Sequence, residues 1–344
     1  MIVSRNIGFI KLMKWSGHHL VWLTAFAGSV AALYHFKIIS VSIPWLPVSV
    51  IGTAVAFYVG FKNSQAYDRM WEARKIWGGI VNDSRAWGMM VDGFITNQFT
   101  QNKLTDDELK SIKRRLIYRH IAWLYAHRSQ LLVPTSWEHI SQGGHLGKTA
   151  EYFQKQFGIG LVDDEVTRLE LKNFLPSDEH DRLVNAVNTA TQIINEQSRE
   201  LTSLREKEVI ENFRHMEMIR VLRSFYEFQG KNERIKKFPL PRQYANMSMY
   251  FVGIFILLFP FSMIPELMKI GEWGLWISIL VSVLIGWMYV MMEVVGDYTE
   301  NPFQGMANDI PMLSICRTIE IDLRQMLGES NLPPAIKAKD DILM

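Results

Sequence analysis

Three side chains at four-residue spacing, Thr53, Phe57 and Phe61, lie in an uncharged run that begins at Ile43. Positions four apart drift by only about 40° around an α-helix, so the three form one narrow stripe. Rings of phenylalanine exclude water and can gate by dewetting, and a threonine hydroxyl can replace part of an ion's hydration shell. A stripe of this kind can line a pore. From the spacing alone, packing inside a helical core is the favoured interpretation, since aromatic residues at helical spacing are usually buried.

Three acidic residues, Glu293, Asp297 and Glu300, lie at the end of the last apolar run and just beyond it. Ionisable groups at a membrane boundary are often functional, and these could place a negative potential at the inner mouth of a pore. We favour a structural role, in which they pair with basic residues on the polar continuation of the stripe-bearing helix, namely Arg69, Arg74 or Lys75.

Signals of catalysis and of cofactor binding are missing from the sequence. There is no glycine-rich phosphate loop and no G-x-S-x-G, and the single cysteine, Cys316, has no recognisable partner base. One cysteine also excludes an internal disulfide and a cysteine-rich metal cluster. The adjacent His18 and His19 point to different faces of a helix, so they do not suggest a metal pair. We predict a protein that is not an enzyme and has neither a cofactor nor a bound metal.

The stripe belongs to the second of four apolar runs, which lie at roughly Leu20–Phe36, Ile43–Phe61, Tyr250–Met268 and Trp273–Met292. A membrane span needs about 20 apolar residues, and the first run, with a core of about seventeen, is the weakest. It is a short or tilted span, or else an interfacial helix. The runs predict two membrane hairpins, 1–61 and 250–292, a mainly cytosolic helical region, 62–249, and a cytosolic C-terminal segment, 293–344.

Basic residues gather on one side of these runs, before the first, after the second and before the third. The two hairpin loops hold only Lys37 and Lys269. Lysine and arginine flank the cytosolic ends of spans, so both termini are expected in the cytosol, with the N-terminal segment retained as an anchor. The net charge of +2 comes without a concentrated basic face, which argues against a nucleic-acid partner.

The polar region between the hairpins is rich in helix formers, and no stretch of it alternates like a strand. Thr105 and Glu108 form a capping box that starts one helix, which runs to about residue 132. Further helices are expected from about Asp178 to Ser203 and from about Glu206 to Phe228, the latter ending near Gly230. The whole chain is expected to be all-α.

Three separated motifs, FYVGFKNSQAYDRMWEARKIWG at 57–78, ERIKKFPLPRQY at 233–244 and ENPFQGMANDIPM at 300–312, resemble those of the bestrophin family, and of its bacterial members in particular. The resemblance covers nearly the whole chain. It implies a homopentamer of α-helical subunits around one central pore, with four membrane spans per subunit. The four apolar runs themselves predict contact with membrane lipids, and with the resemblance to bacterial members they predict a place in the bacterial inner membrane.

The resemblance assigns roles to individual residues. The family's neck, a constriction within the membrane, falls on Thr53, Phe57 and Phe61, and Thr53 departs from the bulky apolar side chains of relatives. The family's cytosolic aperture falls on Phe238, where relatives commonly have an aliphatic residue, so a ring there could narrow the exit. Eukaryotic members bind calcium through an acidic cluster after an Asn-Pro-Phe motif. Here Asp309 is the only nearby acid, too few oxygen ligands for calcium.

We predict a channel that passes monovalent ions passively, with sodium and potassium preferred over chloride. The bacterial members of the family are associated with cation permeation, the stripe contains no basic residue, and the acids at the inner end could attract cations. A chloride channel of the same architecture is the first alternative, because the weakly positive edges of phenylalanine rings tolerate anions. A membrane-anchored scaffold or signalling protein is the second alternative. Such a protein would not conduct ions, which distinguishes it from both kinds of channel.

Overall fold

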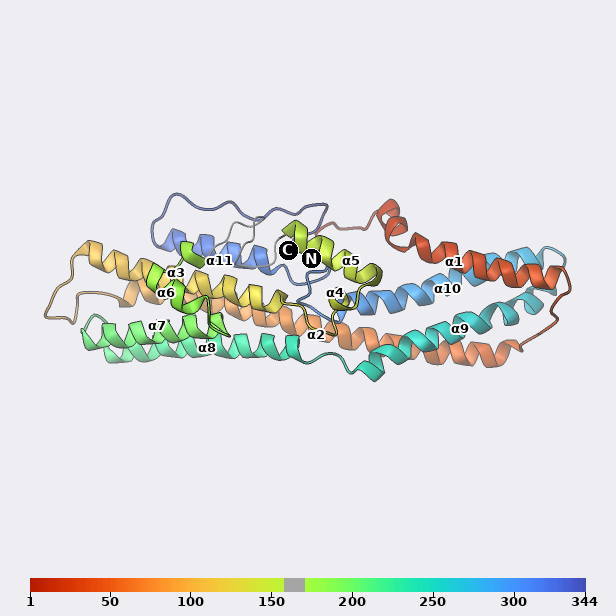
Figure 1. The fold of residues 1–344 in the computed structure, drawn as a ribbon, viewed down its shortest axis with the longest axis horizontal. Helices are drawn as coiled ribbons and strands as arrows, with labels where there is room; N and C mark the ends of the chain where they lie inside the picture. Colours follow the sequence, from red (N-terminus) through yellow and green to blue (C-terminus); the bar gives the residue numbers. More distant parts are fainter. Residues whose placement is uncertain (158–170) are drawn as a thin grey trace. The chain divides into compact units, whose positions relative to one another are not determined.

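The computed structural model describes residues 1–157 and 171–344 of the chain. The expected all-α class is confirmed within these ranges, where β pairing is limited to isolated bridges of Ile2 and Lys339 with Ile342. The helices are labelled in Figure 1 and run as follows: α1 Phe9–His35, α2 Trp45–Phe94, α3 Asp106–Leu132, α4 His139–Gln142, α5 Gly144–Phe157, the 3-10 turn η1 Leu171–Asn173, α6 Ser177–Leu183, α7 Thr189–Glu206, α8 Asn212–Lys237, α9 Arg242–Met268, α10 Gly274–Thr299 and α11 Met312–Met326.

The chain divides into two compact units. The membrane unit comprises Ser4–Arg69 and Pro239–Glu300, and the polar unit comprises Met1–Val3, Met70–Phe238 and Asn301–Met344. Helix α2 contributes its first part to the membrane unit and its second part to the polar unit. The neck stripe and the three acids therefore all belong to the membrane unit, whereas Phe238 and Asp309 belong to the polar unit.

Helix α2 is unbroken over 50 residues, which corresponds to about 75 Å of helix. The apolar run that holds the stripe and the polar segment after it thus share one helix, as the sequence predicts. In the polar unit, Gly79 permits close packing of α8 on α2, because a Cβ at this position would lie 2.6 Å from the ring of Phe228. The glycine is used for a helix contact and does not end the helix.

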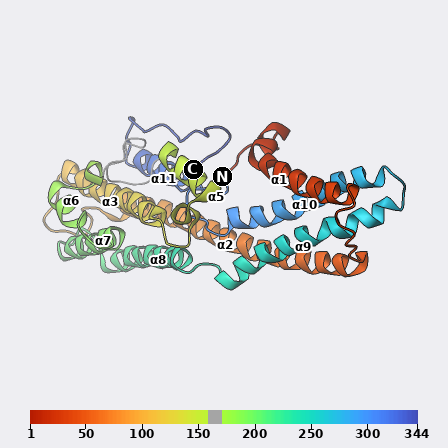
Figure 2. The ribbon, with the colours of Figure 1, turned by 45° about the vertical axis from the view of Figure 1, so that its right-hand side comes forward.

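In the membrane unit, α10 lies against both α1 and α9 (Figures 1 and 2). The shared core includes Leu23, Val59, Val252 and Phe255. Helices α2, α9 and α10 are long and apolar enough to cross a membrane, whereas α1 does not reach the same hydropathy. However, α1 is 27 residues long, or about 40 Å, and begins eleven residues before Leu20, where the first apolar run starts.

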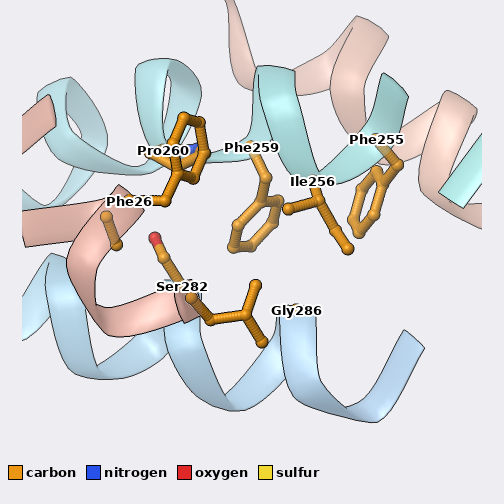
Figure 3. Close-up of a pocket in the computed structure, with 9 residues that line it drawn as sticks. Phe26, Phe255, Ile256, Phe259, Pro260, Ser282 and Gly286 are labelled. Carbon is orange, nitrogen blue, oxygen red and sulfur yellow. The ribbon is translucent and has the colours of Figure 1, made fainter. Parts of the chain in front are cut away.

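Helix α9 continues through two prolines, Pro260 and Pro265. Proline lacks an N–H, so Pro260 leaves the carbonyl of Ile256 without its helical donor. A cavity of about 10 Å³ lies beside this turn, and Ser282 points into it from α10 (Figure 3). The proline turn and Gly286, which contacts Leu23 of α1 closely, leave a small gap in an otherwise close-packed interior.

The capping box at Thr105 and Glu108 is confirmed: the Thr105 side chain accepts the Glu108 N–H, and the Glu108 carboxylate accepts the Thr105 N–H. The single helix expected from about Asp178 to Ser203 is wrong, since the chain forms α6 and α7 there. Asn188 starts the second of these helices, because its side-chain oxygen accepts the N–H of Thr191 and caps the helix.

The expected end of α8 near Gly230 is also wrong, because the helix continues to Lys237. No contact with another part of the chain requires a glycine at Gly230, and its backbone freedom costs the helix some local stability without breaking it. The helix ends where Phe238, which precedes a proline, takes up an extended backbone conformation with φ −117° and ψ 100°.

The interior of the polar unit stacks tryptophan on histidine. The ring of His127 lies between Trp77 and Trp123, with centroid separations of 5.8 and 5.7 Å. Both His127 and His120 are buried, and burial lowers the pKa of each to about 3, so both rings are neutral at physiological pH. These histidines serve the packing of the polar unit.

Candidate pore-lining site

The three residues of the neck stripe are exposed on the single chain. The side chain of Phe57 is 67% exposed and that of Phe61 is 60% exposed, although both lie in an apolar helix. The opposite face of α2 is buried against the rest of the membrane unit, at Gly52, Val55, Val59, Lys62 and Ala66. At about 100° per residue these buried positions centre roughly 180° from the stripe. Packing of the stripe in the core of its own subunit is therefore wrong.

Thr53 differs from the two phenylalanines in having a polar atom. Its hydroxyl donates to the carbonyl oxygen of Ser49, one turn earlier, over 2.9 Å. With the proton used in this bond, the lone pairs of the hydroxyl oxygen remain as acceptors on the exposed face. In this rotamer the threonine level of the stripe suits a cation better than an anion.

Two of the three acids bind one lysine. Glu293 and Asp297, one turn apart on α10, both accept hydrogen bonds from the ammonium group of Lys62 on α2, the latter over 2.6 Å. Glu293 also accepts from the hydroxyl of Ser248 on α9 over 2.6 Å. The side chain of Lys62 is 0% exposed and that of Glu293 is 6% exposed. This buried cluster joins three helices of the membrane unit one residue beyond Phe61.

The third acid, Glu300, pairs with Arg242 at the start of α9, with 3.3 Å between the guanidinium and the carboxylate. Glu300 is buried, and the arginine side chain is 34% exposed. Three carboxylates thus meet two basic side chains, so most of the negative charge at this end of the membrane unit is compensated. The expected pairing of the acids is found, but its basic partners are Lys62 and Arg242, which were not among those expected.

Phe238 caps the C-terminal end of α8 in the polar unit, and its side chain is 67% exposed. Two residues earlier, Lys236 is buried and forms an ion pair of 2.6 Å with Glu138. Burial is the main cause that lowers the pKa of Lys236, while the adjacent carboxylate acts in the opposite direction. The buried pair fixes the end of α8, from which the ring of Phe238 projects.

Asp309 is buried in the loop that follows the Asn-Pro-Phe sequence. One carboxylate oxygen accepts the N–H groups of Gly305 and Met306 over 2.7 and 3.0 Å. Gly305 has a φ of 86°, a left-handed conformation that glycine adopts without strain. Asp309 therefore closes its own loop, and among the residues that the structure describes no three acidic, histidine or cysteine side chains gather to hold a metal ion.

Asp309→Asn should stabilise the protein more at pH 8 than at pH 5. Burial raises the pKa of Asp309 to about 7, from 3.8. An acid whose pKa is higher in the folded than in the unfolded chain binds more protons when folded, so the wild type loses stability as pH rises through this window. The free energy of unfolding of the variant relative to wild type should rise by about 2–3 kcal/mol between pH 5 and pH 8. Thermal unfolding of both proteins in detergent measures this difference, and parallel pH curves would show that Asp309 does not titrate there.

The family model described as bacterial/fungal bestrophin protein matches residues 14–325. This chain belongs to the bestrophin family. The resemblance seen in the three motifs is thereby confirmed.

Relatives of this bestrophin match most or all of its length at low identity. A voltage-dependent anion channel-forming protein of Escherichia coli is 22% identical over 334 residues, which cover 95% of this chain and 93% of the relative. Another from Ralstonia nicotianae is 24% identical over 352 residues, covering 100% of each. The crystal structure of a bacterial bestrophin homologue from Klebsiella pneumoniae has a TM-score of 0.68 and 22% identity, and the match covers 92% of this chain and 97% of that one. This likeness shows a shared fold.

Proposed function

We propose that this bestrophin forms a passive channel for monovalent ions, with five copies of α2 around one pore. The observation that carries the proposal is the neck stripe: Phe57 and Phe61 are exposed on the single chain, on the side of an apolar helix that faces away from its own core. Large apolar side chains on such a face must meet lipid, another subunit or a pore. Their four-residue spacing and the position of Thr53 in the same stripe favour the pore.

The proposed subunit crosses the bacterial inner membrane four times, with α1 as the fourth span and both termini in the cytosol. Helix α1 supports this role by its length and by its packing along α10, which is a candidate span itself. The two hairpins then correspond to 1–61 and 250–292, and residues 62–249 and 293–344 are cytosolic. Labelling of a cysteine placed in the loop 270–272 with a membrane-impermeant reagent tests this orientation, which requires reaction from the outside only.

The purified protein should be a homopentamer with bound lipid. An apolar groove of about 280 Å³ between α2 and α9 supports assembly, because it lies beside the stripe and a neighbouring subunit could fill it. Its lining is Ile51, Ala54, Val55, Tyr58, Phe251 and Ile254. Native mass spectrometry in a mild detergent should give five times the chain mass of 39.9 kDa. A stable monomer or dimer would contradict the proposed assembly.

We propose anions as the permeant ions. The names of the relatives in Escherichia coli and Ralstonia nicotianae refer to anion channels, and the acids expected to attract cations are paired with Lys62 and Arg242. Phenylalanine ring edges carry a weak positive potential that suits an anion. A cation channel is the second candidate, favoured by the outward lone pairs of Thr53. The cation preference expected from the sequence loses the support of the acids, while the hydroxyl of Thr53 and the absence of a basic residue from the stripe still favour it.

Phe238→Ala should change permeation at the cytosolic exit, where we propose that this ring narrows the path. The ring is exposed and its backbone is fixed by the end of α8, so removing it enlarges the exit and leaves the helix intact. We expect relative permeabilities among chloride, bromide and nitrate to change by roughly twofold. The matched control is Phe213→Ala, which removes another exposed ring, 77% exposed, at the opposite end of α8. Identical permeability ratios in wild type and Phe238→Ala would remove this residue from the pathway.

A membrane-anchored scaffold is the class of function that the proposal must exclude. Purified protein reconstituted in liposomes loaded with a salt gradient either dissipates the gradient or leaves it intact. Dissipation that requires the protein supports the channel, whereas intact gradients with correctly assembled protein would favour the scaffold.

A further inference from the structure

We propose that Lys62 is a positioning residue of the neck: bound by Glu293 and Asp297, it sets the rotation of α2 that turns Phe57 and Phe61 toward the pore. The inference rests on the proposed channel function and adds a residue to its machinery. Lys62 itself is fully buried on the opposite side of the helix, so it acts through the helix and does not contact the permeating ion.

The ammonium group of Lys62 has little freedom to move. In the membrane unit, all of whose residues the structure describes, Lys62 is the only lysine or arginine that is buried. An ammonium taken out of water is stable only beside its counter-charges, and removing one partner of such a pair leaves an uncompensated buried charge. Rotation of α2 that carried Lys62 away from Glu293 and Asp297 would therefore be strongly opposed.

Neighbouring contacts reinforce the attachment at this level. The Asn63 side chain donates to the carbonyl oxygen of Met292 on α10 over 2.9 Å. Gly296, three residues after Glu293 on the same helix, lets α2 approach α10, because a Cβ there would collide with the side chain of Asn63. Lys62, Asn63 and Gly296 thus form one close crossing of α2 and α10, immediately after Phe61 along α2.

A second attachment lies at the other end of the stripe. The hydroxyl of Tyr289 on α10 donates to the carbonyl oxygen of Gly52 over 3.0 Å. A Cβ at Gly52 would lie 2.7 Å from the ring of Phe255 on α9, so the glycine is required for this close approach. Gly52 precedes Thr53 and Lys62 follows Phe61, so the two attachments bracket the neck.

Between the two attachments, the buried face of α2 is aliphatic, at Val55 and Val59. Aliphatic contacts are non-directional, so they fix the rotation of the helix less firmly than hydrogen bonds do. Adjacent residues are fixed at about 100° from each other on a helix, so holding Lys62 toward α10 holds Phe61 away from it. The directional bonds of one ammonium to two carboxylates supply the rotational constraint.

The test is a double-mutant cycle on conductance, using Lys62→Met, Phe61→Ala and both together. Methionine keeps the length and apolar stem of lysine but loses its bonds. If Lys62 acts through Phe61, Lys62→Met should change single-channel conductance by roughly threefold or more in the wild type and by much less in the Phe61→Ala background. Lys62→Arg keeps the charge but brings a larger planar group, so it should change the conductance less than Lys62→Met does. Equal effects in both backgrounds, or no effect in either, would overturn the proposal.

A labelling experiment gives an answer that does not depend on ion flux. The single natural cysteine, Cys316, is fully buried, and burial raises its pKa to about 12, so it is a poor target for thiol reagents. A Phe61→Cys variant should be modified by a charged methanethiosulfonate from the pore, and Lys62→Met should lower this rate by roughly threefold or more. An unchanged rate in assembled protein would overturn the positioning role.

One further variant and the wild-type protein keep the outcomes distinct. If the Lys62→Met protein does not assemble, Asp297→Asn takes its place. This substitution removes the more exposed of the two partners of Lys62, since the Asp297 side chain is 28% exposed. It should also lower the labelling rate of Phe61→Cys. An unchanged rate in Asp297→Asn would then overturn the proposal. If wild-type protein conducts no ions, the channel function fails, whereas the rate at position 61 still decides whether Lys62 orients that residue.

Discussion

Replacing Phe57 and Phe61 together by alanine should raise single-channel conductance by roughly tenfold while the protein still assembles. Five copies of each ring would face one axis, so the double substitution removes ten aromatic rings from the narrowest part of the proposed pore. A hydrophobic constriction penalises an ion that must shed its water, and alanine lets water fill the passage. Because neither ring belongs to the core of its own subunit, their removal should cost the fold little.

The matched control is the pair Leu280→Ala and Leu284→Ala on α10. These leucines are also exposed, at 61% and 49%, and are also four residues apart within a candidate span. They share the chemistry and spacing of the stripe but lie on another helix, so their loss should leave conductance unchanged. Equal conductance of wild type and the phenylalanine double variant would show that these rings face lipid or a neighbouring subunit and that the barrier lies elsewhere.

Much of the fold could be predicted because apolar runs and helix signals act locally. The unbroken α2 follows from the absence of a breaker between its apolar and polar parts, and the start of α3 follows from the paired hydrogen bonds of Thr105 and Glu108. The division at Asn188 was missed because a single asparagine within a helical pattern signals a cap only when its side chain reaches the N–H three residues on. Gly230 misled in the opposite direction, since glycine weakens a helix without ending it.

The candidate site was predicted less completely than the fold. The stripe follows from spacing on one helix, and its exposure agrees with that pattern. The partners of the acids depend on how α2, α9 and α10 cross, which no local pattern shows. The sequence contains one signal that Lys62 is buried. Lys62 is a charged residue directly after the apolar run, and it lies on the same face of the helix as Val55 and Val59. A lysine on an apolar face requires a buried counter-charge, and Glu293 and Asp297 are the acids at the matching end of α10.

Under a tenfold potassium chloride gradient in a planar bilayer, the reversal potential should lie near the chloride equilibrium value, about 59 mV in magnitude. Pairing of the three acids with Lys62 and Arg242 removes most of their attraction for cations, and the weakly positive ring edges of the stripe favour anions. The same pairing makes Asp297→Asn and Glu300→Gln informative. If these paired acids do not attract permeant cations, each substitution should leave the sign of the reversal potential unchanged.

Thr53 decides between the two candidate ions, because it has the only polar side chain of the stripe. Thr53→Val keeps the shape of the side chain and removes the hydroxyl that donates to Ser49. If residual cation permeability depends on the outward lone pairs, the variant should move the reversal potential by several millivolts closer to the chloride value. A wild-type reversal potential near the potassium equilibrium value would overturn the anion assignment. Loss of that value in Thr53→Val would then show that the hydroxyl causes the cation preference. The channel proposal would survive either sign, since both require ions to pass the same ring of phenylalanines.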